Sequence, residues 1–179
     1  MPNFKKKHRR YTTELIIRII ILTAVCVLFP YWKEAVSDIT FCLSRIMLQQ
    51  FYPLAHIGHT LFLEDYSLAF VDACSASSAY LLLFILTFIT KGIMLKKRLF
   101  MLLNGSILIL GLNLARILIL VTVLVNAGVN YFENLHIFFW KIVSTIFVFF
   151  TWIYLIKKYK IKSIPVYSDY KQLAAMLKN

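Results

Sequence analysis

The amino-acid sequence predicts an all-α integral membrane protein, a bundle of about four transmembrane helices with an extracytoplasmic interfacial segment between the first and second spans. Composition is the first observation behind this prediction, since hydrophobic residues make up 60% of the 179 residues and charged residues only 16%, with a mean hydropathy of +0.75. Soluble domains carry about 25% charged residues. The second observation is a set of long apolar runs, and the third is the placement of basic residues between them. We treat residues 1–179 as a single membrane domain.

Four apolar runs are expected to cross the membrane. Each approaches the length of about 20 residues that a helix needs to span the hydrocarbon. They occupy residues 15–31, 74–95, 99–125 and 136–156. We do not expect the first run to be a cleaved signal peptide, because Tyr31-Trp32-Lys33-Glu34 follows it in place of a small-residue cleavage site.

The charges predict the orientation of these spans. Basic residues gather in the lead 1–14, between the second and third runs, and in the tail 157–179, whereas most acidic residues lie in segments 32–73 and 126–135. By the positive-inside rule, the expected location is the cell membrane with both termini cytoplasmic. The net charge of +12 follows from this asymmetry. Basic clusters beside spans usually contact anionic lipid, so membrane lipid is an expected partner and nucleic acid is not.

The segment 32–73 is expected to lie outside the cytoplasm. Its first half mixes apolar and charged residues, which is typical of an amphipathic helix in the membrane interface, with a break at Pro53. Its second half, 57–71, alternates on both sides of Glu64-Asp65-Tyr66 and favours a short hairpin that delivers the chain to Cys74.

Polar residues from three runs converge on the outer leaflet in this topology. Cys74 begins the second run, Asn113 and Arg116 lie in the outer half of the third, and His136 begins the fourth. Asn113 and Arg116 share a helix face because they are three residues apart. An arginine within a span costs at least about 2.5 kcal/mol on insertion scales and nearly always faces the bundle interior or a wet cavity. Arg116 is therefore a candidate functional residue, and the alternative is a structural arginine bonded to backbone or to Asn113.

The three cysteines show no paired spacing, so neither a metal site nor a disulfide framework is indicated. Cys26 fits a packing role, and Cys42 fits packing or a disulfide with Cys74. At the start of a helix, with Arg116 or a protonated His136 nearby, the pKa of the Cys74 thiol is expected to fall. His56 and His59 have a spacing that could chelate a metal on a helix, but no third ligand is evident. We expect no metal and no cofactor.

The sequences Ala73-Cys74-Ser75-Ala76 and Asn113-Leu114-Ala115-Arg116, followed by His136, resemble the exosortase/archaeosortase family. The family pattern is Cys-Ser-Gly, then Asn-x-x-Arg, then histidine, in this order on consecutive spans. The resemblance covers roughly residues 64–156, and with about four spans the chain is similar to the compact archaeal-type members. Ala76 departs from the pattern, since the family usually has glycine there.

The resemblance implies a membrane-embedded cysteine transpeptidase or protease. Its substrates would be exported proteins that end in a short motif, a transmembrane helix and a basic cluster, with a lipid, another amine or water as acceptor. Cys74 would be the nucleophile, His136 the general acid and base, and Arg116 the oxyanion donor oriented by Asn113. Ser75 and Asp72 would support the site, and Asp72 could equally cap the second span.

Two alternatives stay open. The first is a non-enzymatic membrane protein in which Asn113, Arg116 and His136 form a polar network that stabilises a helix bundle or assembly. The second is an inactive relative that only binds sorting signals.

Overall fold

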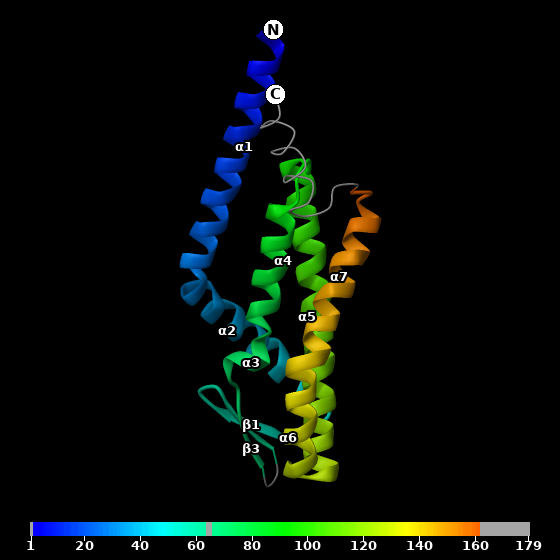
Figure 1. The fold of residues 1–179 in the computed structure, drawn as a ribbon. Helices are drawn as coiled ribbons and strands as arrows, with labels where there is room; N and C mark the ends of the chain where they lie inside the picture. Colours follow the sequence, from blue (N-terminus) through cyan, green and yellow to red (C-terminus); the bar gives the residue numbers. More distant parts are fainter. Residues whose placement is uncertain (1, 64–65, 162–179) are drawn as a thin grey trace.

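The computed structural model describes residues 2–63 and 66–161, with side chains for residues 12–63, 66–71 and 73–161. The chain is mostly helical and also contains a small three-stranded sheet, which the all-α prediction did not include. The elements are α1 (Pro2–Val27), α2 (Phe29–Leu48), β1 (Leu54–Ile57), β2 (Thr60–Leu63), β3 (Tyr66–Ala69), α3 (Asp72–Ser75), α4 (Ser77–Ile89), α5 (Leu95–Ala127), α6 (Val129–Phe138), the π-helix η1 (Phe139–Val143) and α7 (Ser144–Lys158). The long helix α5 runs the length of the helix bundle, with α4 and α7 beside one half and the sheet and α6 at the other end, and α1 extends beyond the bundle (Figure 1).

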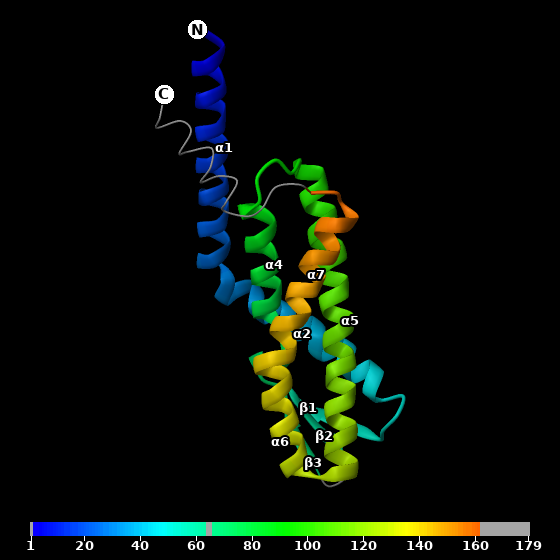
Figure 2. The ribbon, with the colours of Figure 1, turned by 45° about the vertical axis from the view of Figure 1, so that its right-hand side comes forward.

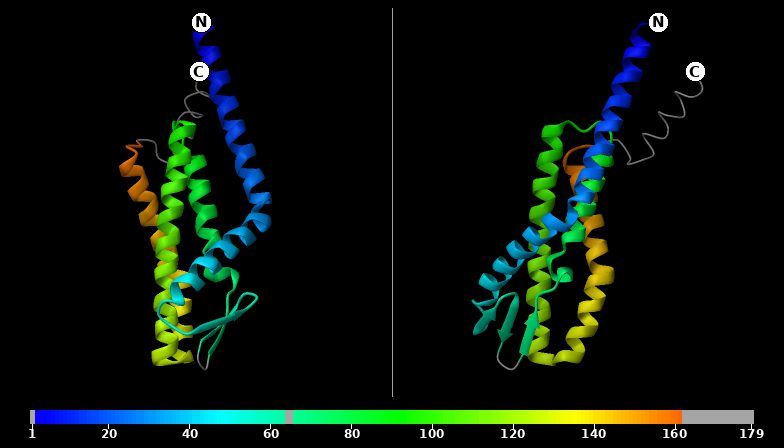
Figure 3. Two further views of the ribbon diagram at one scale, coloured as in Figure 1. Left: turned by 180° about the vertical axis from the view of Figure 1, so that it is seen from behind. Right: turned by 90° about the vertical axis from the view of Figure 1, so that its left-hand side faces the viewer.

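The first predicted span is the beginning of a bent pair of helices. α1 and α2 meet at an angle of 63°, and Pro30 lies at the start of α2. Proline is tolerated in the first turn of a helix but cannot continue the hydrogen-bond ladder of a preceding one, which explains the break after Val27. α2 then crosses the bundle toward the sheet, on the side nearest the viewer in the left view of Figure 3. It buries Thr40, Phe41, Ser44 and Leu48 on one face, so the predicted amphipathic helix is present.

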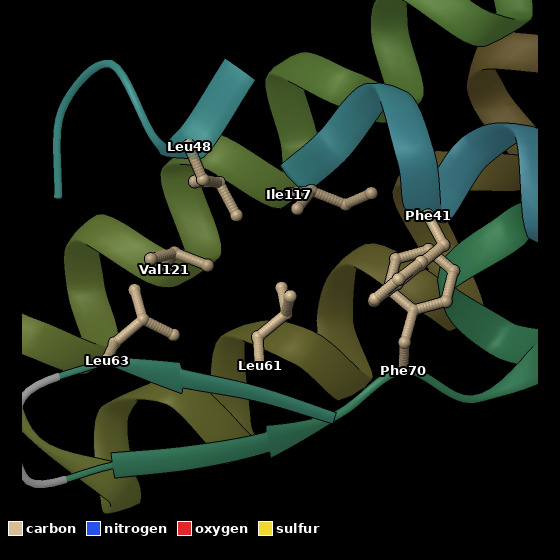
Figure 4. Close-up of a cluster of buried hydrophobic side chains, with 7 residues drawn as sticks. All are labelled: Phe41, Leu48, Leu61, Leu63, Phe70, Ile117 and Val121. Atoms are coloured by element: carbon tan, nitrogen blue, oxygen red, sulfur yellow. The ribbon is translucent and has the colours of Figure 1, made fainter. Parts of the chain in front are cut away.

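The predicted hairpin is present as strands β2 and β3, which pair antiparallel with Leu61 opposite Leu68. A strand that we did not predict, β1, pairs with the other side of β2, and the sheet order is β1-β2-β3. One face of the sheet packs on α2 and α5 through the cluster of Phe41, Leu48, Leu61, Leu63, Phe70, Ile117 and Val121 (Figure 4). This cluster fixes the strand that leads to Cys74 against the helix that carries Arg116.

The second predicted span is shorter than expected. Its apolar helix, α4, starts at Ser77 and ends at Ile89, because Thr90 is extended and Gly92 has a φ of 74°. Cys74 therefore lies before this helix, on the four-residue helix α3. At 1.5 Å per residue, the 13 residues of α4 cover about 20 Å.

The third and fourth predicted spans form a helical hairpin. α5 has 33 residues, and Gly128, with a φ of 86°, permits the turn into α6. α6, η1 and α7 continue as one rod from Val129 to Lys158 that packs along α5 (Figure 2). In the described part of the chain, these two rods are long and apolar enough to cross a membrane, and the bent α1 and α2 pair raises the number to three if it counts as one span.

Candidate functional site

Cys74 lies in a tight turn between the sheet and α4. Its amide donates to the carbonyl of Val71 at 2.8 Å, and the turn ends at Ala76, which has φ 54° and ψ 27°. This left-handed conformation separates α3 from α4. It is favourable for glycine and costs other residues roughly 1–2 kcal/mol. The position where the resembled family has glycine is thus one where the backbone itself favours glycine.

The turn exposes carbonyl groups that the side chains of α5 satisfy. Asn113 donates its amide to the carbonyl of Cys74 at 2.7 Å, and Arg116 donates to the carbonyls of Ala73 at 2.8 Å and Cys74 at 3.3 Å. Asn113 and Arg116 are each only 4% exposed. The structure therefore brings Asn113 and Arg116 to Cys74, through the backbone of the cysteine.

Ser144 completes the environment of Arg116 and was not predicted. Arg116 donates to the Ser144 hydroxyl at 3.3 Å, and that hydroxyl donates to the carbonyl of Phe139 at 2.9 Å. Phe139 begins the π-helix, in which the hydrogen-bond spacing widens by one residue. In this wider turn, the carbonyl of Phe139 accepts hydrogen bonds from both the amide and the hydroxyl of Ser144. No sequence signal marks this residue, because it is one serine in an apolar run.

His136 lies one turn before the π-helix, in α6. Its ring is half-buried and stacks on Phe132, with centroids 5.7 Å apart. It lies within electrostatic reach of Arg116. Among the described residues, no hydrogen bond joins its imidazole to the Cys74 thiol.

Two buried nitrogens at this site have no hydrogen-bond partner in the described part of the chain. They are Nε of Arg116 and Nε2 of His136, and Nε of Arg45 on α2 is the third buried side-chain nitrogen in that state. Buried polar atoms are nearly always satisfied, so an orphan needs an explanation such as a catalytic role or an unplaced water. Two of these three unpartnered nitrogens belong to residues that we predicted to be catalytic.

A cavity of about 170 Å³ adjoins Arg116. It lies between the α3 and α4 turn, α5, and the start of α7, with the lining residues Ala73, Ala76, Ser78, Ala79, Leu82, Arg116, Trp140, Ser144, Thr145 and Val148. The lining is small or apolar apart from the guanidinium and three hydroxyl groups. Neither Cys74 nor His136 is among the lining residues of this cavity.

The environment of the Cys74 thiol differs from the predicted one. The residue packs against the apolar cluster of Figure 4 and lies outside the apolar helices. Burial raises the pKa of the thiol, and the backbone hydrogen bond with Val71 and the charge of Arg116 oppose this rise only in part. The direction is opposite to the one we expected, because the desolvation of the buried thiol outweighs the two effects that lower its pKa. The raised pKa favours the thiol form of Cys74.

The remaining predicted residues are placed as follows. Ser75 is completely buried in α3, and the side chain of Asp72 lies outside the described residues. Cys26, Cys42 and Cys74 are all unpaired, so the disulfide alternative is wrong for this structure, and Cys26 is exposed on α1 where packing was expected.

The two histidines of the sheet segment, His56 and His59, contact α2. His56 lies 2.9 Å from a guanidinium nitrogen of Arg45, and His59 lies 3.1 Å from a carboxylate oxygen of Asp38. These contacts hold β1 and the turn that follows it against α2, so the two histidines have a structural role.

Comparison of the chain with protein-family models, curated proteins and solved structures gave no significant match. The assignment of a function therefore depends on the geometry of the site and on the sequence pattern described above.

Proposed function

We propose that the protein is a membrane-embedded cysteine transpeptidase or protease, similar to exosortases and archaeosortases, that cleaves a C-terminal sorting signal of exported proteins at the outer membrane face. The observation that carries the proposal is the convergence of Cys74, Asn113 and Arg116, with unpartnered buried nitrogens on Arg116 and His136. Buried polar atoms are nearly always satisfied, so these two nitrogens support a role for the site beyond stability.

The chemistry would proceed in two steps. His136 takes the proton of the Cys74 thiol, the sulfur bonds to the scissile carbonyl carbon, and the oxygen becomes an oxyanion. We assign Nε of Arg116 as the donor to that oxyanion, because it has no hydrogen-bond partner among the described residues, whereas both terminal nitrogens already donate to the Ala73, Cys74 and Ser144 oxygens.

The carbon–nitrogen bond then breaks, and His136 gives its proton to the leaving amine. The thioester that remains on Cys74 is attacked by an acceptor amine or by water. His136 removes the proton of that nucleophile, and the sulfur leaves as the thiol. Transfer to a lipid or another surface amine makes the protein a transpeptidase, and transfer to water makes it a protease.

The proposal assigns four membrane crossings, with both termini cytoplasmic and the site on the outer side. α5 is about 50 Å long at 1.5 Å per residue, whereas the hydrocarbon is about 30 Å thick. Counted from Leu99, the first residue after the basic start of α5, Arg116 lies about 26 Å along the helix. This depth is close to the outer boundary, where a substrate's extended segment enters its transmembrane helix.

The test is cleavage of a reporter. Exported proteins of the same organism that end in a short motif, an apolar helix and a basic cluster supply the tails, and each tail is fused to a secreted reporter with epitope tags on both sides. Co-expression with the wild-type chain is expected to separate the tags, and Cys74→Ala is expected to abolish separation, at least 10³-fold, because the nucleophile is absent.

Cys42→Ala is the matched control, since Cys42 is a free, exposed cysteine on α2. Its processing rate is expected to equal that of the wild type. Undiminished processing by Cys74→Ala, at matched protein level, would contradict the proposed mechanism.

A second candidate function is a non-enzymatic membrane protein with a structural polar network. The observation in its favour is that Asn113 and Arg116 bond to the backbone of the turn, and that the Cys74 side chain packs among apolar residues. In that case Arg116→Ala would lower the thermal stability of the purified chain while Cys74→Ala would have no effect on the reporter. The two candidates thus differ in the outcome of the same cleavage assay.

A further inference from the structure

The outer edge of β3 carries unpaired backbone groups. Register places Thr60 opposite Ala69 and Phe62 opposite Ser67, and the Phe70 amide donates to the His59 carbonyl at 2.9 Å. Hydrogen-bonded and non-hydrogen-bonded pairs alternate in an antiparallel ladder. The groups of Tyr66, Leu68 and Phe70 therefore face β2, and the N–H and C=O groups of Ser67 and Ala69 face away from it.

This edge is open in the described part of the chain. β3 is the last strand in the sheet order, Ser67 and Ala69 are exposed, and no hydrogen bond between described residues reaches their main-chain groups. The chain stays extended through Val71, with φ −99° and ψ 165°, and Val71 is 50% exposed. The open edge thus ends three residues before the nucleophile, and Figure 3 shows β3 leading directly to α3.

We propose that this edge binds the substrate as an extended peptide strand, by main-chain pairing with Ser67 and Ala69. The inference rests on the proposed function and deepens it by naming how the scissile segment is held. Strand addition to a sheet edge takes its affinity from backbone hydrogen bonds and its specificity from side-chain pockets. The substrate segment would pair parallel to β3, with its C-terminal end toward Cys74. This orientation would bring its carbonyl groups to the thiol and to Arg116.

A peptide is the occupant that fits the edge. The unpaired groups alternate with groups bonded to β2, at the two-residue period that another strand presents. A second copy of the chain could pair at the same edge, but it would then cover the approach to Cys74 in both copies. The fixed core under the sheet, with Leu61 and Leu63 fully buried, supplies a rigid template.

Proline substitution tests the edge without opening the sheet. Ser67→Pro and Ala69→Pro each delete an N–H that faces away from β2, and proline is tolerated at such edge positions. Ser67→Ala and Ala69→Ser keep the N–H and are the matched controls. We expect each proline variant to lower kcat/KM for the reporter roughly tenfold through KM, because a main-chain hydrogen bond to the substrate is lost, and each control to stay within about twofold.

Binding is measured independently of cleavage. Full-length Cys74→Ala in lipid nanodiscs is incubated with a synthetic peptide covering the motif of a reporter tail, and amide hydrogen exchange is followed by residue-resolved mass spectrometry. The amides of Ser67 and Ala69 are expected to become protected. Unchanged circular dichroism and an unchanged alkylation rate of Cys74 in the proline variants on the active background establish that the site is intact.

The outcomes distinguish failure of the edge proposal from failure of the proposed function. Processing by the proline variants at the wild-type rate overturns the edge proposal while the proposed function stands. If no tail is cleaved by the wild type, the proposed function fails, and protection of Ser67 and Ala69 by the peptide still supports the edge. Absence of that protection overturns the edge proposal. Protection that appears without peptide and increases with protein concentration also overturns it, because the edge would then bind a second copy of the chain.

Discussion

At the scale of single residues, Ala76 controls the geometry of the site. Its left-handed φ of 54° turns the chain so that the carbonyls of Ala73 and Cys74 meet Arg116. An L-residue with a side chain is strained there by roughly 1–2 kcal/mol. The glycine that the resembled family has at this position removes the strain, so Ala76 is a local cost that the contacts of Asn113 and Arg116 offset.

Ala76→Gly is therefore expected to stabilise the protein by about 1 kcal/mol, because glycine adopts this conformation without a clash of its Cβ. The measurement is thermal unfolding of the purified chain in one detergent. Ala79→Gly, three residues later in the first turn of α4, is the control and is expected to destabilise by about 0.5–1 kcal/mol, because glycine has a lower helix propensity than alanine. Equal effects at the two positions would argue against the strained turn.

At the scale of elements, the short helix α4 depends on two arginines at its end. Arg98 is 7% exposed and donates to the carbonyls of Thr87, Phe88 and Thr90, and Arg18 donates to the carbonyl of Ile89. The last four carbonyls of a helix have no intrahelical partner. The guanidinium groups satisfy them and place positive charge at the negative end of the helix dipole. A helix of 13 residues can thus end within the inner boundary of a membrane without unpaired carbonyls.

Packing between α4, α5 and α7 depends on Gly105. A Cβ at this position would lie 2.6 Å from a Leu83 methyl and 2.9 Å from a Leu155 methyl. Gly105→Ala is expected to destabilise the protein by about 1–3 kcal/mol through overpacking. Gly111 on the same helix has no atom within 4 Å of such a Cβ, so Gly111→Ala is expected to stabilise by about 0.5–1 kcal/mol through helix propensity. Thermal unfolding of the two variants checks this, and a neutral Gly105→Ala would mean that the helices are further apart than described.

The elements also divide into those that sequence patterns could predict and those that they could not. Alternation around residues 64–66 predicted the β2 and β3 hairpin, and the mixed segment after Trp32 predicted α2. β1 was missed because its four residues follow Pro53 directly and are too few to show a period. The length of α4 was overestimated, since hydropathy does not report that the chain leaves the helix at Thr90.

Sequence patterns likewise predicted one part of the candidate site and missed another. The spacing of Asn113 and Arg116, and the order of the runs, predicted their approach to Cys74. Their contact with carbonyls instead of the thiol follows from the turn at Ala76, and an alanine gives no sign of a left-handed φ. Ser144 and the π-helix arise from tertiary packing, and their residues are ordinary members of an apolar run.

At the scale of the whole molecule, two helical rods in the described part of the chain are long and apolar enough to cross a membrane, or three if the bent α1 and α2 pair is one span, and the proposed topology adds α4 as a further crossing. The N-terminal end of α1, the connection between α4 and α5 and the end of α7 lie at one end, and the sheet and the turn between α5 and α6 lie at the other (Figure 1). The basic residues 91–98 and 157–160 fall at the first end, which the positive-inside rule assigns to the cytoplasm. In the proposed topology the thirteen residues of α4 would be the shortest crossing, and α3 with its turn would lie at the outer boundary.

Cysteine labelling tests this topology. In a background with Cys26→Ala, Cys42→Ala and Cys74→Ala, single variants Ile57→Cys and Tyr131→Cys are expected to react with a membrane-impermeant maleimide in intact cells, since both positions are exposed at the outer end, 75% and 68%. Lys97→Cys, exposed at the start of α5, is expected to react only after permeabilisation.

An epitope placed before Met1 completes the test, because it reports on α1 alone. Four crossings require that this epitope, like Lys97→Cys, is detected only after permeabilisation. If the bent α1 and α2 pair enters and leaves the membrane on one side, the epitope is detected in intact cells, like Ile57→Cys. Labelling of Lys97→Cys in intact cells would instead place the basic connection between α4 and α5 outside the cytoplasm and would contradict the proposed topology.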